Sequence, residues 1–254
     1  MNAQHSWQII AFVIVPYLAL TVFVMGHIWR YRFDRFGWTS RSSQLYERRL
    51  LLIGAPLFHY GALLAILGHA TGLLLPKSWT TAVGIPESLY SGFSKVAGTT
   101  AAVLIVIGLV VLTARRVGSA RVRAVTSAVD WVGIALLWVM IALGVLVTVG
   151  YNVLGPGYEY RGTVSLWLRG IFSFHPDVSA IAAAPWIFQV HATVAWLFLA
   201  LFPFTRFVHF WSAPVWYLTR PFVLYRRRKG EMVLSPGESR AWQTFGRGNG
   251  GPRL

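Results

Sequence analysis

The chain has 254 residues, 56% of them hydrophobic and 12% charged, whereas an average soluble domain carries roughly 25% charged residues. It has no cysteine, which excludes disulfide bonds, a thiolate haem ligand and a cysteine-bound iron–sulfur cluster in this chain. The formal net charge of +15 could indicate nucleic-acid binding, but the positions of the basic residues argue against that class.

Five stretches are long and apolar enough to be transmembrane helices, since a span needs about 18 or more residues with few charges. They lie at about residues 7–29, 51–75, 93–114, 127–150 and 184–210. The first lacks the basic start and the small-residue cleavage site of a signal peptide, so we expect a true span there. The predicted fold is an all-α integral membrane protein, a bundle of five transmembrane helices.

Most of the 23 Lys and Arg residues lie between spans one and two, between spans three and four, or after span five. The exceptions are Lys77, Lys95, Arg161, Arg169 and Arg206. Because Lys and Arg accumulate in cytoplasmic loops, this pattern predicts an N-terminus outside and a cytoplasmic C-terminus. An odd number of spans likewise places the two termini on opposite sides of the membrane. The basic charge therefore indicates membrane topology, and we expect no nucleic-acid partner.

The second span carries His59 and His69 and no other ionisable residue. An ionisable group inside a span costs free energy and usually marks function. On a helix the two histidines would lie about 15 Å apart along the axis and about 80° apart around it. We expect the neighbouring glycines Gly61, Gly68 and Gly72 to let a flat macrocycle approach the backbone.

Spans three and four carry no histidine, and their many small residues would let membrane helices approach closely. Asp130 lies near the cytoplasmic end of span four. We expect it to pair with the loop that carries Arg121 and Arg123, with a place on a proton path as the alternative. The following loop, residues 151–184, is predicted to be the longest outer connection, and it contains His175.

The fifth span carries His191 and His209, which are eighteen residues apart. Eighteen residues correspond to about five whole helical turns, so both side chains would face the same side. Spans two and five run in opposite directions through the membrane. The sequence therefore predicts an inner pair, His59 with His209, and an outer pair, His69 with His191.

Imidazole nitrogen is a good axial ligand to haem iron, and two histidines on one iron favour electron transfer because no open position remains. Two pairs at different depths therefore predict two haems stacked across the membrane. A zinc or copper site would bring its ligands together at one point instead. The structural alternative is that the four histidines are core residues hydrogen-bonded to neighbouring helices.

Two haems at different depths would carry electrons across the membrane. No motif for a nucleotide or flavin occurs, because the glycines of GRGNGG, residues 246–251, follow no predicted strand. We therefore expect the donor to be a lipid-soluble quinol. The acceptor would be a partner protein on the basic, cytoplasmic face.

Four stretches resemble the gamma subunit, the b-type cytochrome, of the membrane-bound respiratory nitrate reductase. They are SSQLYERR, LFHYGALLAILGHATG, RRVGSARVRA and LFPFTRFVHFWSAPVWYLTRP, at residues 42–49, 57–72, 115–124 and 201–221. The resemblance implies two b haems, with His59 and His209 as ligands of the inner haem and His69 and His191 as ligands of the outer haem.

The resemblance also implies oxidation of menaquinol or ubiquinol at the outer side of the prokaryotic cytoplasmic membrane, with proton release there. Electrons would pass inward to an iron–sulfur beta subunit and then to a molybdenum-containing alpha subunit, which would reduce nitrate in anaerobic respiration or nitrate assimilation. The chain would thus be the quinol-oxidising subunit of a quinol:nitrate oxidoreductase.

The sequence departs from the family where some members place a lysine near the outer haem. An ungapped comparison puts Tyr90 there, and the nearest lysine is Lys95, so these two residues are the candidates for the quinol site. Residues 1–225 would form the dihaem membrane domain. The basic, Gly-rich residues 226–254 are expected to be a flexible cytoplasmic tail.

Two alternatives to this function stay open. The chain could be the cytochrome b subunit of another quinol-linked reductase, for example one that reduces a sulfur compound. It could also be a haem-free membrane anchor or a transporter, although transporters usually show internal repeats and this sequence shows none.

Overall fold

A computed structural model describes residues 3–34 and 43–212, which belong to one compact unit, Met1–Ala213. All regular elements among these residues are helices. Five of them are long and apolar enough to cross a membrane, at Ser6–Phe33, Arg49–Leu74, Glu87–Gly118, Ala128–Val153 and Trp186–Phe204. The predicted all-helical fold with five spans is therefore confirmed. The predicted tail, residues 226–254, lies outside the described residues.

Three of the spans contain a π-helical segment that continues an α-helix. The elements that make up the five spans are α1 Ala3–Ile9 with η1 Ile10–Ile14 and α2 Val15–Phe33, α3 Arg49–His69 with η3 Ala70–Leu74, α5 Glu87–Gly118, α7 Ala128–Val145 with η4 Leu146–Val153, and α10 Trp186–Leu201 with η6 Phe202–Phe204. The shorter elements are α4 Lys77–Ala82, α6 Ala120–Ala124, η5 Tyr160–Gly162, α8 Val164–Phe172, α9 Val178–Ala182, η7 Arg206–Val208 and α11 His209–Ser212.

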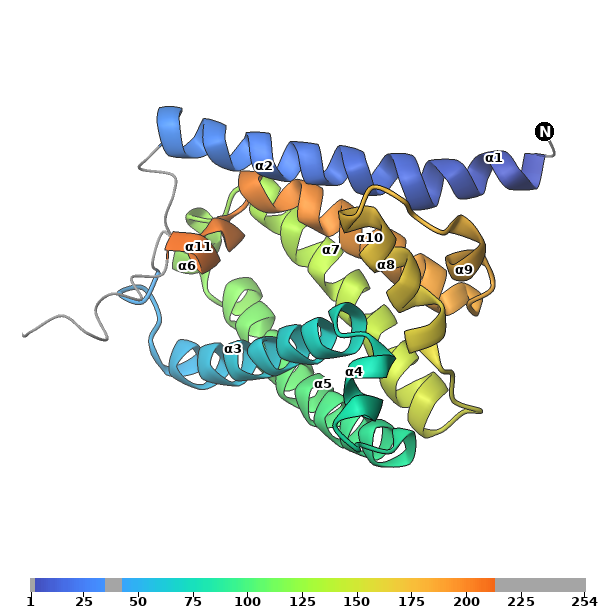
Figure 1. Ribbon diagram of the computed structural model, residues 1–254. Coiled ribbons are helices and arrows are strands. Elements are labelled where there is room, and N and C mark those ends of the chain that lie inside the picture. Colours follow the sequence, from blue (N-terminus) through green and yellow to red (C-terminus); the bar gives the residue numbers. More distant parts are fainter. Residues whose placement is uncertain (1–2, 35–42, 213–254) are drawn as a thin grey trace, which may run out of the picture. The chain divides into compact units, whose positions relative to one another are not determined.

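Two ends of the bundle can be followed in Figure 1. At one end, on the right of the view, lie α8, α9 and the start of α1, and we call it the α8 end. At the other end lie α6, α11 and the start of α3, and we call it the α11 end. Helix α10 runs from the α8 end towards the α11 end beside α2, and α3 runs the opposite way.

Helices α3 and α5 pack closely because glycines remove side chains from their contact. A Cβ atom at Gly108 of α5 would lie 2.4 Å from the backbone nitrogen of Phe58 and 2.9 Å from the carbonyl oxygen of Gly54. A Cβ atom at Gly61 would lie 2.8 Å from the backbone nitrogen of Ile105. The backbone of α3, which carries His59 and His69, is therefore held directly against α5.

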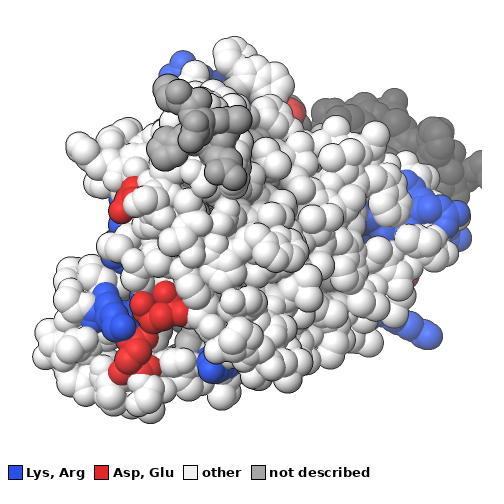
Figure 2. Space-filling view, turned by 90° about the vertical axis from the view of Figure 1, so that its right-hand side faces the viewer, with Lys and Arg blue, Asp and Glu red and all other residues white. Residues whose placement is uncertain are grey.

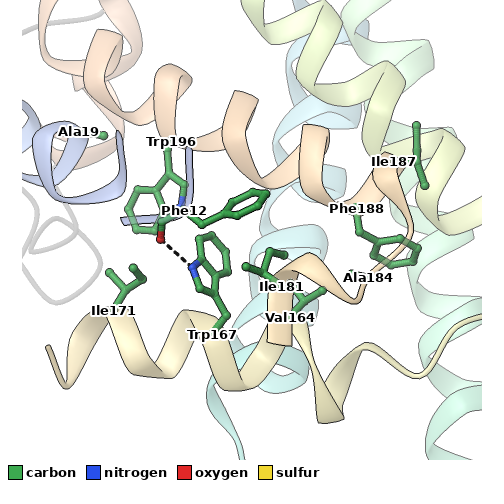
Figure 3. Close-up of a cluster of buried hydrophobic side chains, with 10 residues drawn as sticks. All are labelled: Phe12, Ala19, Val164, Trp167, Ile171, Ile181, Ala184, Ile187, Phe188 and Trp196. Carbon is green, nitrogen blue, oxygen red and sulfur yellow. Dashed lines mark hydrogen bonds between the residues drawn. The ribbon is translucent and has the colours of Figure 1, made fainter. Parts of the chain in front are cut away.

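An aromatic core joins α2 and α10 to the α8 end. It contains Phe12 and Trp167, each 1% exposed, together with Trp196. The Trp167 Nε1–H donates a hydrogen bond to the Phe12 carbonyl at 2.8 Å (Figure 3). Phe12 lies in the π-helical segment η1, so α8 fixes this first span through a backbone group as well as through apolar contacts.

Residues 151–184, predicted to be a connection, supply much of this core. Helix α8 contributes Trp167 and Ile171, and α9 contributes Ile181, all of them almost fully buried. The periodicity of such short helices is easily missed in a segment rich in Gly, Pro and aromatic residues. The segment is therefore a structural layer across the α8 end of the bundle, and these three side chains pack inward.

Charged side chains at the α8 end pair with one another. Figure 2, which faces this end, shows a mostly uncharged surface with acidic and basic side chains side by side at its lower left and other charged side chains near its edges. The ion pairs here link Lys77 to Glu87 at 3.7 Å, Lys77 to Glu159 at 3.8 Å and the almost fully buried Arg161 to Glu87 at 3.4 Å. These contacts connect α4, the start of α5 and η5.

The fifth span ends earlier than predicted. The sequence predicts a helix to residue 210, whereas α10 ends at Leu201 and a 3-10 turn, η6, closes the span. Pro203 lies in that turn, and proline disfavours helix both at its own position and at the preceding one. Thr205 is extended, with φ −104° and ψ 176°. The expected five whole turns between His191 and His209 therefore do not exist.

Candidate functional site

His59 and His209 come together although they lie on different elements. His59 is in the middle of α3, and His209 is the first residue of the short helix α11. Their Nε2 atoms are 3.4 Å apart, and their ring centroids are 5.7 Å apart. The structure thus brings together the residues of the predicted inner pair.

His69 and His191 form a second pair of facing rings, with centroids 6.2 Å apart. His69 is the last residue of α3, and His191 lies within α10. Because α3 is continuous between His59 and His69, the two pairs lie at levels about 15 Å apart along that helix. The predicted pairing of the four residues matches the arrangement, while their role as ligands stays a prediction.

Three of the four rings have a fixed tautomer. The Nδ1 atoms of His59, His69 and His209 lie 2.7, 2.7 and 2.6 Å from backbone carbonyl oxygens of Ala55, Ala65 and Arg206. A carbonyl oxygen can only accept, so each Nδ1 carries the proton and donates it. Burial lowers the pKa of His209, which favours its neutral form. The Nε2 atom of each neutral ring therefore carries a lone pair.

His191 is the exception. Its Nδ1 is buried and makes no hydrogen bond of normal geometry to the described residues. The ring lies against Gly144 of α7, where a Cβ atom would be 3.2 Å from the His191 Cε1 atom. The absence of a side chain at Gly144 therefore makes room for this imidazole.

The His59–His209 pair has the geometry of two ligands to one metal ion. When both rings are neutral, their Nε2 lone pairs face each other at 3.4 Å and neither ring can donate to the other. Imidazole nitrogen binds metal ions at about 2 Å, so two nitrogens on opposite sides of one ion are about 4 Å apart. A retreat of the two rings by about half an ångström would satisfy this distance.

The number of ligands favours haem over a metal held by protein alone. Among the described residues, no three His, Cys, Asp or Glu side chains converge on one point, whereas a protein-bound zinc usually has three or four protein ligands. In haem the macrocycle supplies the remaining ligands, and two histidines suffice. His59 and His69 are exposed residues beside their partners, so neighbouring side chains do not enclose either pair completely. The residues therefore fit the group.

The glycines near the histidines serve different purposes from those predicted. Only Gly68 faces open space, with no atom within 4 Å of a Cβ placed there. Gly61 packs against α5, and Gly72 accommodates the hydroxyl of Tyr160, which would lie 2.6 Å from a Cβ at that position. Two of the three glycines thus allow close protein contacts, which the sequence alone could not distinguish from contacts with a macrocycle.

Asp130 pairs with Arg206, and the prediction that it pairs with the loop of Arg121 and Arg123 is wrong. Arg206 Nε and Nη2 donate to the two carboxylate oxygens at 2.9 and 2.6 Å. Arg206 comes close because the chain turns back after Pro203. The proline in LFPFTRF is the sequence signal that could have indicated this turn.

The two candidates for the quinol site lie in different surroundings. The Tyr90 ring packs against the Arg161 guanidinium, whose carbon is 4.0 Å from the ring centroid. Lys95 lines a pocket of about 280 Å³ together with Val96, Thr99, Thr100 and Val153. No histidine lines this pocket. His175 lies apart from both pairs, in the turn between α8 and α9, where its Nδ1–H donates to the Ser173 carbonyl at 2.8 Å.

The chain is similar to known nitrate reductase gamma chains over most of its length. A family model described as nitrate reductase gamma subunit matches residues 8–228. The nitrate reductase gamma chain of Bacillus subtilis (strain 168) is 41% identical over 228 residues, covering 90% of this chain and 100% of the relative. The respiratory nitrate reductase 1 gamma chain of Escherichia coli (strain K12) is 36% identical over 219 residues, covering 85% and 96%.

A longer relative contains a similar region. The nitrate reductase-like protein NarX of Mycobacterium tuberculosis (strain ATCC 25618 / H37Rv) is 43% identical over 230 residues, covering 90% of this chain but 35% of the relative. This chain therefore spans about a third of that protein's length. The match over nearly the whole chain, together with the gamma chains of two further organisms, confirms the resemblance: the chain belongs to the nitrate reductase gamma subunit family.

Proposed function

We propose that the chain is the dihaem cytochrome b subunit through which a membrane-bound nitrate reductase oxidises quinol. The observation that carries the proposal is the arrangement of four histidines as two facing pairs, His59 with His209 and His69 with His191. Membership of the nitrate reductase gamma subunit family supports it. A haem-free anchor would give no reason for two pairs of facing imidazole rings at different levels of the bundle.

Each histidine pair would hold one haem b through its Nε2 atoms. The bound haems would supply reversible one-electron chemistry at iron. The chain's own contribution would be two imidazole nitrogens for each haem, which would leave no position on the iron for oxygen or another ligand. Carbonyl acceptors at Nδ1 of His59, His69 and His209 hold those rings in the orientation that presents Nε2.

The distribution of basic residues supports a direction for electron transfer. Arg30, Arg115, Arg116 and Arg206 lie at the α11 end, so we propose that this end faces the cytoplasm and that the N-terminus lies outside. The membrane would be the prokaryotic cytoplasmic membrane. The His69–His191 pair would then lie nearer the outer side, where quinol would be oxidised and its protons released.

The partners follow from the same orientation. The relatives in Bacillus subtilis and Escherichia coli are gamma chains of nitrate reductases, and such a name implies further subunits. We propose an iron–sulfur beta subunit and a molybdenum-containing alpha subunit on the cytoplasmic face, with nitrate reduction in the alpha subunit. Co-purification of the chain with these subunits tests this assignment against another quinol-linked reductase.

A reduction experiment tests the quinol step. The purified haem-loaded chain is mixed with a reduced quinol analogue, and the absorbance of reduced b haem is followed. We expect reduction of the haem in the parent chain and none in His69→Ala or His191→Ala. Equal reduction rates in the parent chain and in both variants would contradict quinol oxidation at the outer pair. Tyr90→Phe and Lys95→Gln, assayed in the same way, test the two quinol-site candidates.

A further inference from the structure

His209 is not held in place by helix α10. The helix ends at Leu201, and the chain then passes through the turn η6, the extended Thr205 and the turn η7 before it reaches His209. The break itself is anchored to α2, because Arg30 Nη1 donates to the Pro203 carbonyl at 3.0 Å. A further tether is needed to fix the residues that follow the break, since no helical ladder continues through them.

Arg206 provides that tether. Its guanidinium donates two hydrogen bonds to the Asp130 carboxylate, at 2.9 and 2.6 Å, and Asp130 is 6% exposed. A bidentate pair of this kind fixes the position of both side chains. Asp130 is itself held at the first turn of α7, because its carboxylate accepts from the Ser127 backbone and its backbone N–H donates to the Ser127 hydroxyl.

The tether reaches the imidazole through one backbone group. The carbonyl of Arg206 accepts the His209 Nδ1–H at 2.6 Å, and the opposite nitrogen of the ring faces His59 Nε2. Hydrogen bonds of this kind set the tautomer, orientation and basicity of a histidine ligand. The position of the Arg206 carbonyl therefore sets the orientation in which His209 Nε2 faces His59.

We infer that Asp130 and Arg206 are positioning residues for His209, and that they set the coordination of the haem at the His59–His209 pair without touching it. The inference rests on the proposed function, because it takes His209 as a haem ligand. The His69–His191 pair is held differently, since His191 lies within a regular helix and its Nδ1 makes no hydrogen bond of normal geometry to the described residues.

The test compares Asp130→Asn and Arg206→Gln in the full haem-loaded chain. Electron paramagnetic resonance of the oxidised protein resolves low-spin haems, and the signal lost in His209→Ala identifies the haem of the His59–His209 pair. We expect both variants to shift or broaden this signal and to shift the midpoint potential of this haem alone. Haem affinity at this site should fall by about 10–100-fold.

Two further variants separate positioning from general loosening. Glu47→Gln is the matched control, because Glu47 pairs with the buried Arg115 at 2.7 Å and no hydrogen bond links this pair to a histidine. It should leave both haem signals unchanged. Asp130→Glu keeps the charge and should restore most of the parent signal, and Arg206→Gln alone provides the disrupted tether if Asp130→Asn does not fold.

Three results would overturn the inference. They are equal shifts at both haems in Asp130→Asn, the same shift in Glu47→Gln, or unchanged signals in both Asp130→Asn and Arg206→Gln with haem fully bound. A parent chain without haem would instead contradict the proposed function itself, so the two failures can be told apart.

Discussion

The two histidine pairs are held by different means. In the His69–His191 pair both residues belong to long regular helices, α3 and α10, and their positions follow from helix geometry. In the His59–His209 pair only His59 has such support, and His209 follows a break in the chain. The comparison shows that similar facing geometry can arise from regular structure or from a few specific polar contacts.

The difference extends to the surroundings of each pair. Near His69, the Ser165 hydroxyl of α8 donates to the Leu73 carbonyl at 2.8 Å and fixes the π-helical turn η3 that follows the histidine. Near His209 the corresponding support is the Asp130–Arg206 ion pair. One pair therefore depends on the apolar layer at the α8 end, and the other depends on buried charge at the α11 end.

Removal of one ligand from each pair should produce the largest effects. We expect His191→Ala and His209→Ala each to retain about one of two haems, because a single imidazole leaves an axial position open. His191→Ala should also abolish reduction by quinol, whereas His209→Ala should retain it and lose electron transfer to the partner. Haem content is measured per polypeptide, and activity is measured as quinol:nitrate turnover in the complex.

The control for both ligand variants is His175→Ala, since His175 lies outside the pairs in an exposed turn. It should retain both haems and full turnover. If His191→Ala and His209→Ala removed the same haem, the division into two pairs would be wrong.

A change in the contact between α3 and α5 should affect both pairs alike, because α3 carries one histidine of each. Gly108→Ala would place a Cβ atom 2.4 Å from the Phe58 backbone nitrogen, and such overpacking costs roughly 1–3 kcal/mol. Thermal unfolding in detergent should show the loss, with both haems released together. Gly92→Ala, on the same helix with no atom within 4 Å, should leave the unfolding temperature unchanged or slightly higher.

Trp167→Phe should weaken the α8 end selectively. The substitution removes the hydrogen bond to the Phe12 carbonyl, and such a bond contributes roughly 0.5–1.5 kcal/mol. We expect a lower unfolding temperature and faster haem loss from the His69–His191 pair than from the other pair. Trp7→Phe is the control, because Trp7 is 47% exposed; an equal loss of stability there would refute the role of this hydrogen bond.

Thr205→Val should have the smallest effect, at the α11 end. The Thr205 hydroxyl accepts from the Phe207 backbone N–H at 3.2 Å and donates to the Phe202 carbonyl at 2.9 Å. Loss of such a cap costs about 1 kcal/mol, and we expect a small shift in the spectrum of the haem at the His59–His209 pair only. Thr100→Val, which removes an exposed hydroxyl, should change neither haem.

Much of the fold could be predicted from sequence because apolar length and histidines within apolar stretches are strong local signals. The five spans and the His69–His191 pair need only helix geometry and opposite span directions. The break after Leu201 and the partner of Asp130 depend on contacts between residues far apart in the chain. The burial of Trp167 likewise depends on how α8 lies across the bundle, so sequence periodicity alone placed it in a connection.

The sequence predicts the pairing of His59 with His209 correctly, but the helix on which that prediction depends is interrupted in the structure. The sequence predicts that His209 faces His59 because a continuous helix would bring it round after five turns. In the structure Pro203 interrupts that helix, and Arg206 returns the chain to Asp130. His209 therefore faces His59 because the Asp130–Arg206 ion pair and the hydrogen bond from His209 to the Arg206 carbonyl replace the missing helical hydrogen bonds.

The central claim is that the chain binds two haems, one at each histidine pair. The most direct measurement is a reduced-minus-oxidised absorption spectrum of the purified full-length chain, with haem b quantified per polypeptide. We expect the spectrum of b-type haem, with about two haems per chain. A chain that contains no haem when purified from haem-replete cells would contradict it, and the four histidines would then be packing residues of a membrane anchor.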